Sequence, residues 1–263
     1  MTNPEPTIRV NVDVTNPGQF FACCGLLELA DRLWAGATGW FESTGFRVAP
    51  VSPSDGVRTL AALLTEVGAA SLEQIDPQDD YSSPIRLAGP WGLTLDWWKD
   101  GNAGGSKLKV WAGSMRSVRI AAAMQAALSD PDVQTETLLN HARVVRNPAG
   151  DKVEPFYFDS RRGGNAQSLD IGFAPDSFQM TTAAYPAVEF LCLVGLQRCR
   201  PMPTGKPRVF DYYTWTTPLR PSVLPPVVCG LLRTQGSHVY RFENAFRTDQ
   251  RKHKGFLPAT PLD

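Results

Sequence analysis

Residues 7–34 read TIRVNVDVTNPGQFFACCGLLELADRLW, and this stretch decides the fold that we expect for the chain. In its first part, Thr7–Val14, apolar and polar residues alternate, which is typical of a half-buried β-strand. Asn16 is a favoured helix cap, and Pro17 suits the first helical position because its missing N–H would be unpaired there anyway. The pattern then predicts an almost entirely buried helix over 18–34.

Gly25 lies in the middle of this predicted helix, where glycine costs about 1 kcal/mol relative to alanine. We therefore expect another backbone to approach closely there, most simply a strand packed across the helix. The chain has five cysteines and no CxxC pair. Cys23, Cys24 and Cys192 lie in apolar, helix-like runs, so we expect them to be buried, unpaired thiols of a cytoplasmic protein.

Further along the chain, the pattern predicts a second buried helix over Pro186–Arg198, which also begins with proline and has a central cysteine and glycine. A strand pair is expected over Trp40–Val48, turning near Ser43–Gly45. The remaining predicted elements are a helix from Ser54 or Asp55 to Val67, a hairpin over Ile85–Trp98, an alanine-rich helix within Val110–Leu128, two short strands over Pro155–Ile171, and strands over Arg208–Pro218 and Ser237–Phe246.

These elements indicate an α+β fold with mainly antiparallel sheets and packed helices. We expect residues 1–263 to form a single compact unit, with 129–151 as the best candidate for an internal boundary.

The composition is globular, with 43% hydrophobic and 20% charged residues and a formal net charge of zero. A free-standing DNA-binding domain usually carries a clear basic excess, so any contact with nucleic acid must come from local patches. We expect no membrane association, because no run of eighteen apolar residues occurs. We also expect that residues 1–10 are not a signal peptide, because they have no basic region followed by an apolar one.

No catalytic or metal-binding motif stands out in the sequence. The histidines are scattered singly, as His141, His238 and His253, and there is no HExxH, GxSxG or Walker pattern. Adjacent acids such as Asp79 and Asp80 are more typical of a solvated surface than of an acid–base pair. We therefore expect a non-enzymatic protein without cofactor or metal. The enzymatic alternative is a metal-independent ribonuclease that uses His141 or His238.

The segment 161–165, RRGGN, is the most suggestive candidate for nucleic-acid binding. Its two glycines allow close approach of a phosphate chain, which two guanidiniums can then bind. The candidate binding residues are Arg161, Arg162, Gly163, Gly164 and Asn165, together with Arg143, Arg146 and Lys152, which precede them. The alternative is a surface hairpin tip with solvated arginines. If these arginines contact phosphate, we expect alanine at Arg161 and Arg162 to leave folding little affected. A loss of stability as large as that of a core substitution would instead make them structural ion-pair partners.

Two other groups of basic residues favour structural roles. Trp91, Trp97, Trp98 and Trp111 lie near Lys99, Lys107 and Lys109. Such a group could stack bases, but the alternation of Leu93, Leu95 and Trp97 favours a buried sheet face. The C-terminal basic run, Arg241, Arg247, Arg251, Lys252, His253 and Lys254, is more typical of a solvated tail.

Several stretches resemble one protein family. Asn16–Ala30, NPGQFFACCGLLELA, resembles the opening helix of small CRISPR-associated proteins from type I-U loci, also called type I-G. Phe156–Asp170, Tyr185–Pro201 and Lys109–Gly113 are similar to the same group, so the resemblance covers most of the chain. None of these stretches is a catalytic signature.

The resemblance implies a subunit or accessory of a Cascade-type, RNA-guided antiviral effector. It also implies a ferredoxin-like, RNA-recognition-type fold, with which the opening strand–helix–strand order is compatible. In such complexes base pairing identifies the target sequence, and proteins hold the nucleic-acid backbone. The implied partners are other Cas subunits, crRNA and target DNA. Two hypotheses stay open: a subunit that contacts crRNA or target DNA through Arg161, Arg162 and nearby basic residues, and a subunit that binds only other proteins.

Overall fold

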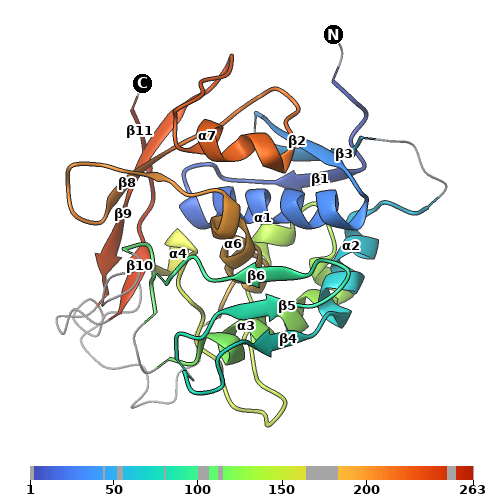
Figure 1. Cartoon of the computed structure of the whole chain (residues 1–263), viewed down its shortest axis with the longest axis vertical. Helices are drawn as coiled ribbons and strands as arrows, with labels where there is room; N and C mark the ends of the chain where they lie inside the picture. The colour runs from blue at the N-terminus through green and yellow to red at the C-terminus, as the bar shows by residue number, and fades with distance from the viewer. Residues whose placement is uncertain are drawn as a thin grey trace.

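The structure is a computed structural model that describes residues 3–43, 45–51, 56–79, 81–99, 107–111, 115–163, 183–247 and 253–262. Figure 1 shows two long helices in the middle of the molecule, with one sheet above them, one below and one at the side. The sheets are all antiparallel, so the fold is α+β as predicted. The buried apolar residues form one contiguous cluster that reaches from Ile8 to Ala259.

The first sheet has the order β1-β3-β2, formed by β1 (Ile8–Asn11), β2 (Ala37–Glu42) and β3 (Gly45–Pro50). Ile8 and Val10 are buried and the intervening residues are exposed, which confirms the predicted alternating strand. The predicted strand pair is confirmed as the β2–β3 hairpin. This strand–helix–strand–strand unit has the order of the first four of the six elements of a ferredoxin-like fold. However, β7 (Met202–Pro203), the strand that follows the second long helix, pairs with β8 instead of β1.

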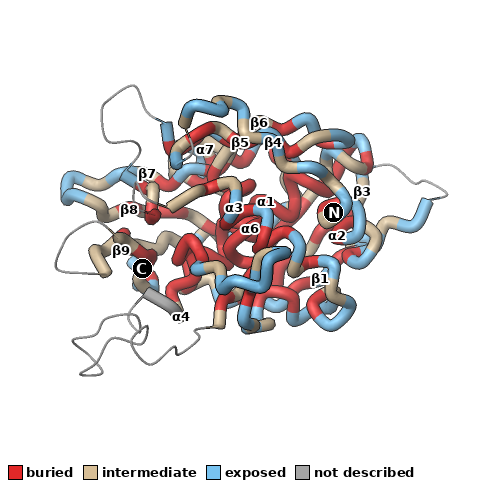
Figure 2. Tube along the Cα trace, turned by 90° about the horizontal axis from the view of Figure 1, so that it is seen from below, coloured by how far each residue is buried: buried red, intermediate tan, exposed pale blue. Residues whose placement is uncertain are grey.

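Helix α1 (Pro17–Leu33) forms where the sequence predicts it. The Asn16 side chain accepts hydrogen bonds from the backbone N–H groups of Gly18 and Gln19, and so satisfies two donors that have no partner within the helix. All residues of the helix from Pro17 to Ala30 are buried, as the red core of Figure 2 shows. The predicted burial of Cys23, Cys24 and Cys192 as unpaired thiols is also confirmed.

Helix α6 (Pro186–Arg198) is the close partner of α1. A Cβ atom placed on Gly25 would lie 2.0 Å from the Leu191 carbonyl oxygen, and one on Gly195 would lie 2.0 Å from the Phe21 carbonyl oxygen. Each helix therefore uses a glycine to admit the backbone of the other. The close approach at Gly25 is confirmed, but the expectation of a strand is wrong, because the approaching backbone is helical.

The second sheet has the order β10-β9-β8-β7 and covers the N-terminal part of α1. Phe20 and Phe21 of α1 pack against Tyr212 of this sheet, whose hydroxyl donates to the Val14 carbonyl. Its strands after β7 are β8 (Val209–Tyr213), β9 (Val239–Phe246), β10 (Lys254–Phe256) and β11 (Thr260–Pro261), which also pairs with β9. The predicted strands near 208–218 and 237–246 are thereby confirmed.

The third sheet consists of β4 (Leu72–Gln74), β5 (Ile85–Leu87) and β6 (Leu93–Leu95), and the predicted hairpin within 85–98 is confirmed as β5–β6. The tryptophans near it are core residues: Trp91, Trp97, Trp98 and Trp111 are all buried. The Trp97 indole N–H donates to the Leu193 carbonyl of α6, so this aromatic group anchors the sheet to the central helices.

Shorter helices complete the described chain. They are α2 (Leu60–Ala69), α3 (Ser117–Ala126), α4 (Ser160–Gly163), α7 (Leu224–Val228), and the 3-10 turns η1 (Ala127–Ser129), η2 (Pro131–Val133), η3 (Leu138–Asn140) and η5 (Pro221–Val223). The cap of α2 is Thr59, whose hydroxyl accepts from the Ala62 N–H, and not Ser54 or Asp55, which lie outside the described residues. Residues 155–163 form a loop and α4 in place of a predicted strand, and 164–171 lie outside the described residues.

Candidate nucleic-acid interface

The side chain of Arg161 is held by the protein itself. Its Nε donates to Asp159 Oδ1 at 2.9 Å, and its Nη2 donates to Asp159 Oδ2 at 2.6 Å and to the Leu139 carbonyl at 2.7 Å. Its Nη1 donates to Asn140 Oδ1 at 2.8 Å, and the guanidinium lies 3.5 Å from the centre of the Tyr185 ring. These bonds use four of the five N–H donors of an arginine. A solvated loop tip is therefore wrong for Arg161.

The other residues of the RRGGN segment contribute less to the described site. Gly163 is the last residue of α4. The side chain of Arg162 and the whole of Gly164 and Asn165 lie outside the described residues. Binding of nucleic acid by this segment stays a prediction. Arg161 has one N–H left with which to donate a hydrogen bond to a phosphate oxygen.

Arg161 belongs to a buried polar network that joins α4 to both central helices. The Asp159 side chain is fully buried and accepts a hydrogen bond from Asn16 Nδ2 at 3.1 Å as well as those from Arg161. Glu189 of α6, also buried, accepts from the backbone N–H of Asp159 at 3.1 Å. Burial raises the pKa of Glu189 to about 8. The neighbouring Asp159 carboxylate also raises this pKa, whereas the backbone N–H groups that donate to Glu189 lower it.

Glu189 should make the stability of the protein fall as pH rises. Its pKa of about 8 in the folded protein lies above that of an unfolded glutamate, about 4.3. Between these values the folded state holds a proton that the unfolded state has lost, so the contribution is complete below pH 4 and is lost as pH rises through 8. We expect Glu189→Gln to flatten this part of the pH dependence, measured as the free energy of unfolding in urea at pH 5, 6.5 and 8. Equal slopes for the variant and the wild type would contradict this assignment.

Arg143 also has an internal partner. Its Nη2 donates to Asp130 Oδ2 at 2.5 Å, and its Nη1 donates to the Ala127 carbonyl at 3.3 Å. A backbone bridge to Ala184 fixes the chain at the same residue. Arg143 and Arg161 thus hold separate acidic residues, Asp130 and Asp159, and the structure does not combine them into one cationic face.

Arg146 and Lys152 lie at a groove beside α3. Their backbones form an antiparallel bridge, and directly opposed residues in such a bridge project from the same face. Both line a groove of about 850 Å³ between α3 and residues 146–154. Arg116, at the N-cap of α3, and Arg119 line the same groove from the helix. Lys152 and Arg146 are thus the predicted site residues that the structure does bring together.

The groove has a cationic rim and an apolar floor. Its charged lining residues are Arg116, Arg119, Arg146, Lys152 and Glu154, a net charge of +3. The floor includes Ala122 and Ala126, which are exposed. They lie on the same face of α3 as Arg119, because residues spaced three or four positions apart share one face of a helix. Sequence reasoning missed Arg116 and Arg119, although this helical stripe was visible within the predicted alanine-rich helix.

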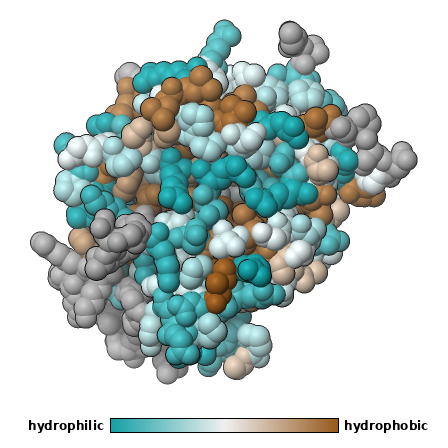
Figure 3. All heavy atoms as spheres, viewed as in Figure 1, coloured by the Kyte–Doolittle hydropathy of each residue, from teal (hydrophilic) through white to brown (hydrophobic). Residues whose placement is uncertain are grey.

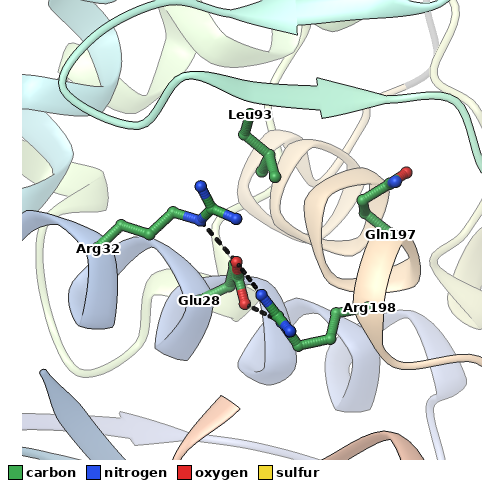
Figure 4. Close-up of a pocket in the computed structure, with 5 residues that line it drawn as sticks. All are labelled: Glu28, Arg32, Leu93, Gln197 and Arg198. Carbon is green, nitrogen blue, oxygen red and sulfur yellow. Dashed lines mark hydrogen bonds and ion pairs between the residues drawn. The ribbon is translucent and has the colours of Figure 1, made fainter. Parts of the chain in front are cut away.

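The cavity in Figure 4 has a different character. Arg198 donates through Nε and Nη2 to both carboxylate oxygens of Glu28, and Arg32 Nε donates to the same carboxylate at 2.6 Å. Burial alone would raise the pKa of Glu28, but the two guanidiniums hold it below its ordinary value. We interpret the Glu28 network as an ion cluster that ties α1 to α6.

On the face shown in Figure 3, hydrophilic side chains form a band below an apolar patch over α7.

The C-terminal basic run is mostly built into the second sheet. Arg241 forms a two-bond pair with Asp211 at 2.7 and 2.8 Å, and the Arg247 guanidinium lies 3.1 Å from the centre of the Tyr157 ring. The expected solvated tail is therefore wrong for these residues, while Arg251 and Lys252 lie outside the described residues. The reason is that β9 and β10 pair across this segment.

Comparison with known proteins identifies no relative: no protein-family model, curated protein or solved structure matches the chain. Within the described residues, no three or more histidine, cysteine or acidic side chains are placed to hold a metal ion. In the same part of the chain, no helix has both the length and the apolar character needed to cross a membrane.

Proposed function

We propose that this chain is a cytoplasmic, non-enzymatic subunit of a type I CRISPR effector complex, and that the α3 groove holds the backbone of crRNA or target DNA. The resemblance of Asn16–Ala30 and the other quoted stretches to small type I-G proteins supports the first part. The observation that carries the second part is the α3 groove, where four cationic side chains surround an exposed apolar floor.

The chemistry of the groove favours phosphate contact over base recognition. Arginine and lysine bind phosphate oxygens by charge-assisted hydrogen bonds, and such contacts position a nucleic acid without selecting its sequence. Among the described lining residues no aromatic side chain is present on which a base could stack. Binding of this kind suits a protein whose partner strand is selected by base pairing with a guide.

Removal of three groove cations should weaken nucleic-acid binding without selecting between sequences. We expect Arg119→Ala, Arg146→Ala and Lys152→Ala, combined in one variant, to reduce affinity about equally for unrelated single-stranded RNAs. Each lost phosphate contact lowers the slope of log affinity against log salt by about 0.7 for single strands, so the slope should fall by about 2. The measurement is fluorescence anisotropy of labelled oligonucleotides over a series of salt concentrations.

A control variant removes the same charge from other surfaces. Arg86, Lys206 and Arg233 are exposed and do not line the α3 groove, so their combined alanine variant keeps the groove intact. The proposal requires that this control bind RNA more tightly than the groove variant. If the two triple variants bind RNA equally at every salt concentration, the groove is not the binding surface.

The alternatives predict different results. A subunit that binds only proteins would assemble with the other Cas proteins of a type I-G locus, and the groove variant would leave the crRNA content of that complex unchanged. A metal-independent ribonuclease would cleave RNA in the presence of a chelator and would lose activity on His141→Ala or His238→Ala. His141 Nε2 lies 2.9 Å from Thr137 Oγ1, so this side chain already has a neutral partner.

A further inference from the structure

Figure 1 shows the end of the second sheet where β9 and β10 pair, and three cationic residues lie near one another there. Lys254 begins β10, directly opposite Phe246 of β9. The Arg208 guanidinium lies 4.5 Å from the centre of the same Phe246 ring. Lys109 approaches from the segment 107–111, which runs beside both strands because Lys254 N–H donates to the Val110 carbonyl at 3.0 Å.

Of these three cations, Lys254 has the least compensation from negative charge. Lys254 is a half-buried residue, and its ammonium makes no hydrogen bond or ion pair within the described part of the chain. Arg208 approaches one carboxylate, Glu243, at 3.6 Å. Lys109 donates to the Ser82 hydroxyl at 2.9 Å and lies near the Asp79 carboxylate. Burial, with Arg208 and Lys109 nearby, lowers the pKa of Lys254 to about 8. The charge at Lys254 is therefore poorly compensated by the protein.

The backbone and the polar atoms around the cluster are also unusual. Arg208 adopts a φ of 60°, a left-handed conformation that residues other than glycine adopt mainly at special sites. Within the described residues, buried polar atoms without a hydrogen-bond partner include Arg208 Nε, Trp111 Nε1 and Asn244 Oδ1. Asn244 links the cluster, because its N–H donates to the Arg208 carbonyl and its Nδ2 donates to the Lys107 carbonyl.

We propose that Lys254, Arg208 and Lys109 form a site for a phosphate-class oxyanion, distinct from the α3 groove. Partly desolvated cations are costly unless opposite charge and hydrogen bonds compensate them, and an oxyanion supplies both. The ammonium of Lys254 and the guanidinium of Arg208 can donate to different oxygens of one phosphate group. That group is carried either by a nucleotide or by the backbone of a nucleic acid.

The test compares the melting temperature of the full-length chain in phosphate and in chloride at equal ionic strength and pH 7. Phosphate at about ten times its dissociation constant should raise the melting temperature of the wild type by about 3 °C more than chloride does. Lys254→Gln and Arg208→Gln should lose this difference. In chloride, Lys254→Gln should melt no lower than the wild type, because it removes a poorly compensated charge. Arg86→Gln, an exposed control on β5, should keep the full phosphate effect.

Two further probes identify the source of the phosphate. Adenosine monophosphate and a ten-nucleotide uridine RNA are titrated into the wild type, Lys254→Gln and the triple variant of the α3 groove. A Lys254-dependent shift with the mononucleotide assigns a nucleotide site, and one that requires the RNA assigns a backbone site. Equal responses to phosphate and chloride, or a full phosphate response in Lys254→Gln, overturn the proposal. The triple groove variant should keep the phosphate effect, so failure of one proposal does not imply failure of the other.

Discussion

Gly25→Ala should lower the free energy of unfolding by about 3 kcal/mol, a large effect for the addition of one methyl group. The added Cβ would lie 2.0 Å from the Leu191 carbonyl oxygen, whereas ordinary contacts begin at 3.4 Å. The obstacle is backbone in the middle of α6, so it cannot rotate away as a side chain can. The two central helices would have to separate by about 1.4 Å, which would loosen the packing on both sides of the crossing.

A second glycine provides the matched control. Gly68 lies within α2, where an added Cβ would meet the hydroxyl oxygen of Ser129, a side-chain atom that can rotate. Gly68→Ala should therefore cost little, because alanine is favoured over glycine within a helix by about 1 kcal/mol. The measurement is urea unfolding followed by circular dichroism. Similar midpoints for Gly25→Ala and Gly68→Ala would show that the α1–α6 contact is not tight.

The reciprocal glycine extends the test. Gly195→Ala should cost as much as Gly25→Ala, because its Cβ would lie 2.0 Å from the Phe21 carbonyl oxygen. The double variant should lose less stability than the two single variants summed, since a separation forced by the first methyl group makes room for the second. Additive losses would indicate that the two glycines do not act at one crossing.

The sequence predicted α1 well because its signals are local. Asn16 and Pro17 mark its start, and its apolar residues leave only a narrow polar stripe. The partner of Gly25 was predicted wrongly, because a glycine within a helix indicates that a backbone comes close but not which element provides it. Gly195 is 170 positions away in the sequence, and the local pattern of neither helix pairs the two glycines.

The candidate sites were less predictable, because they depend on packing between distant segments. Arg146 lies 27 residues after Arg119, and the two share a groove only because residues 146–154 pack along α3. For Arg161, the adjacent glycines suggested an exposed loop. The sequence could not show that Asp159 is buried, or that the Leu139 carbonyl accepts a hydrogen bond from the guanidinium.

Arg161→Ala should destabilise the protein by about 3 kcal/mol, against the sequence-based expectation that folding would be little affected. Removing one partner of a buried ion pair leaves an uncompensated buried charge, at a cost of about 3–5 kcal/mol. The lower value applies because the Arg161 side chain is 33% exposed, whereas that of Asp159 is 0% exposed. After the substitution, Asp159 would keep only neutral donors, the Asn16 amide and the backbone N–H of residue 161.

Arg143→Ala is the matched control for Arg161→Ala, because both arginines pair with an aspartate. The Arg143–Asp130 pair has side chains that are 36% and 30% exposed, and pairs at the surface contribute about 0–1 kcal/mol.

The double variant Arg161→Ala with Asp159→Asn should regain part of the stability, since it removes the buried charge that the single variant leaves without a partner. If Arg161→Ala instead unfolds at the wild-type urea concentration and binds RNA more weakly, Arg161 acts in nucleic-acid binding, as the RRGGN pattern suggested. A loss of stability with RNA binding intact identifies the guanidinium as the counter-charge that allows Asp159 to be buried between α4 and the cap of α1.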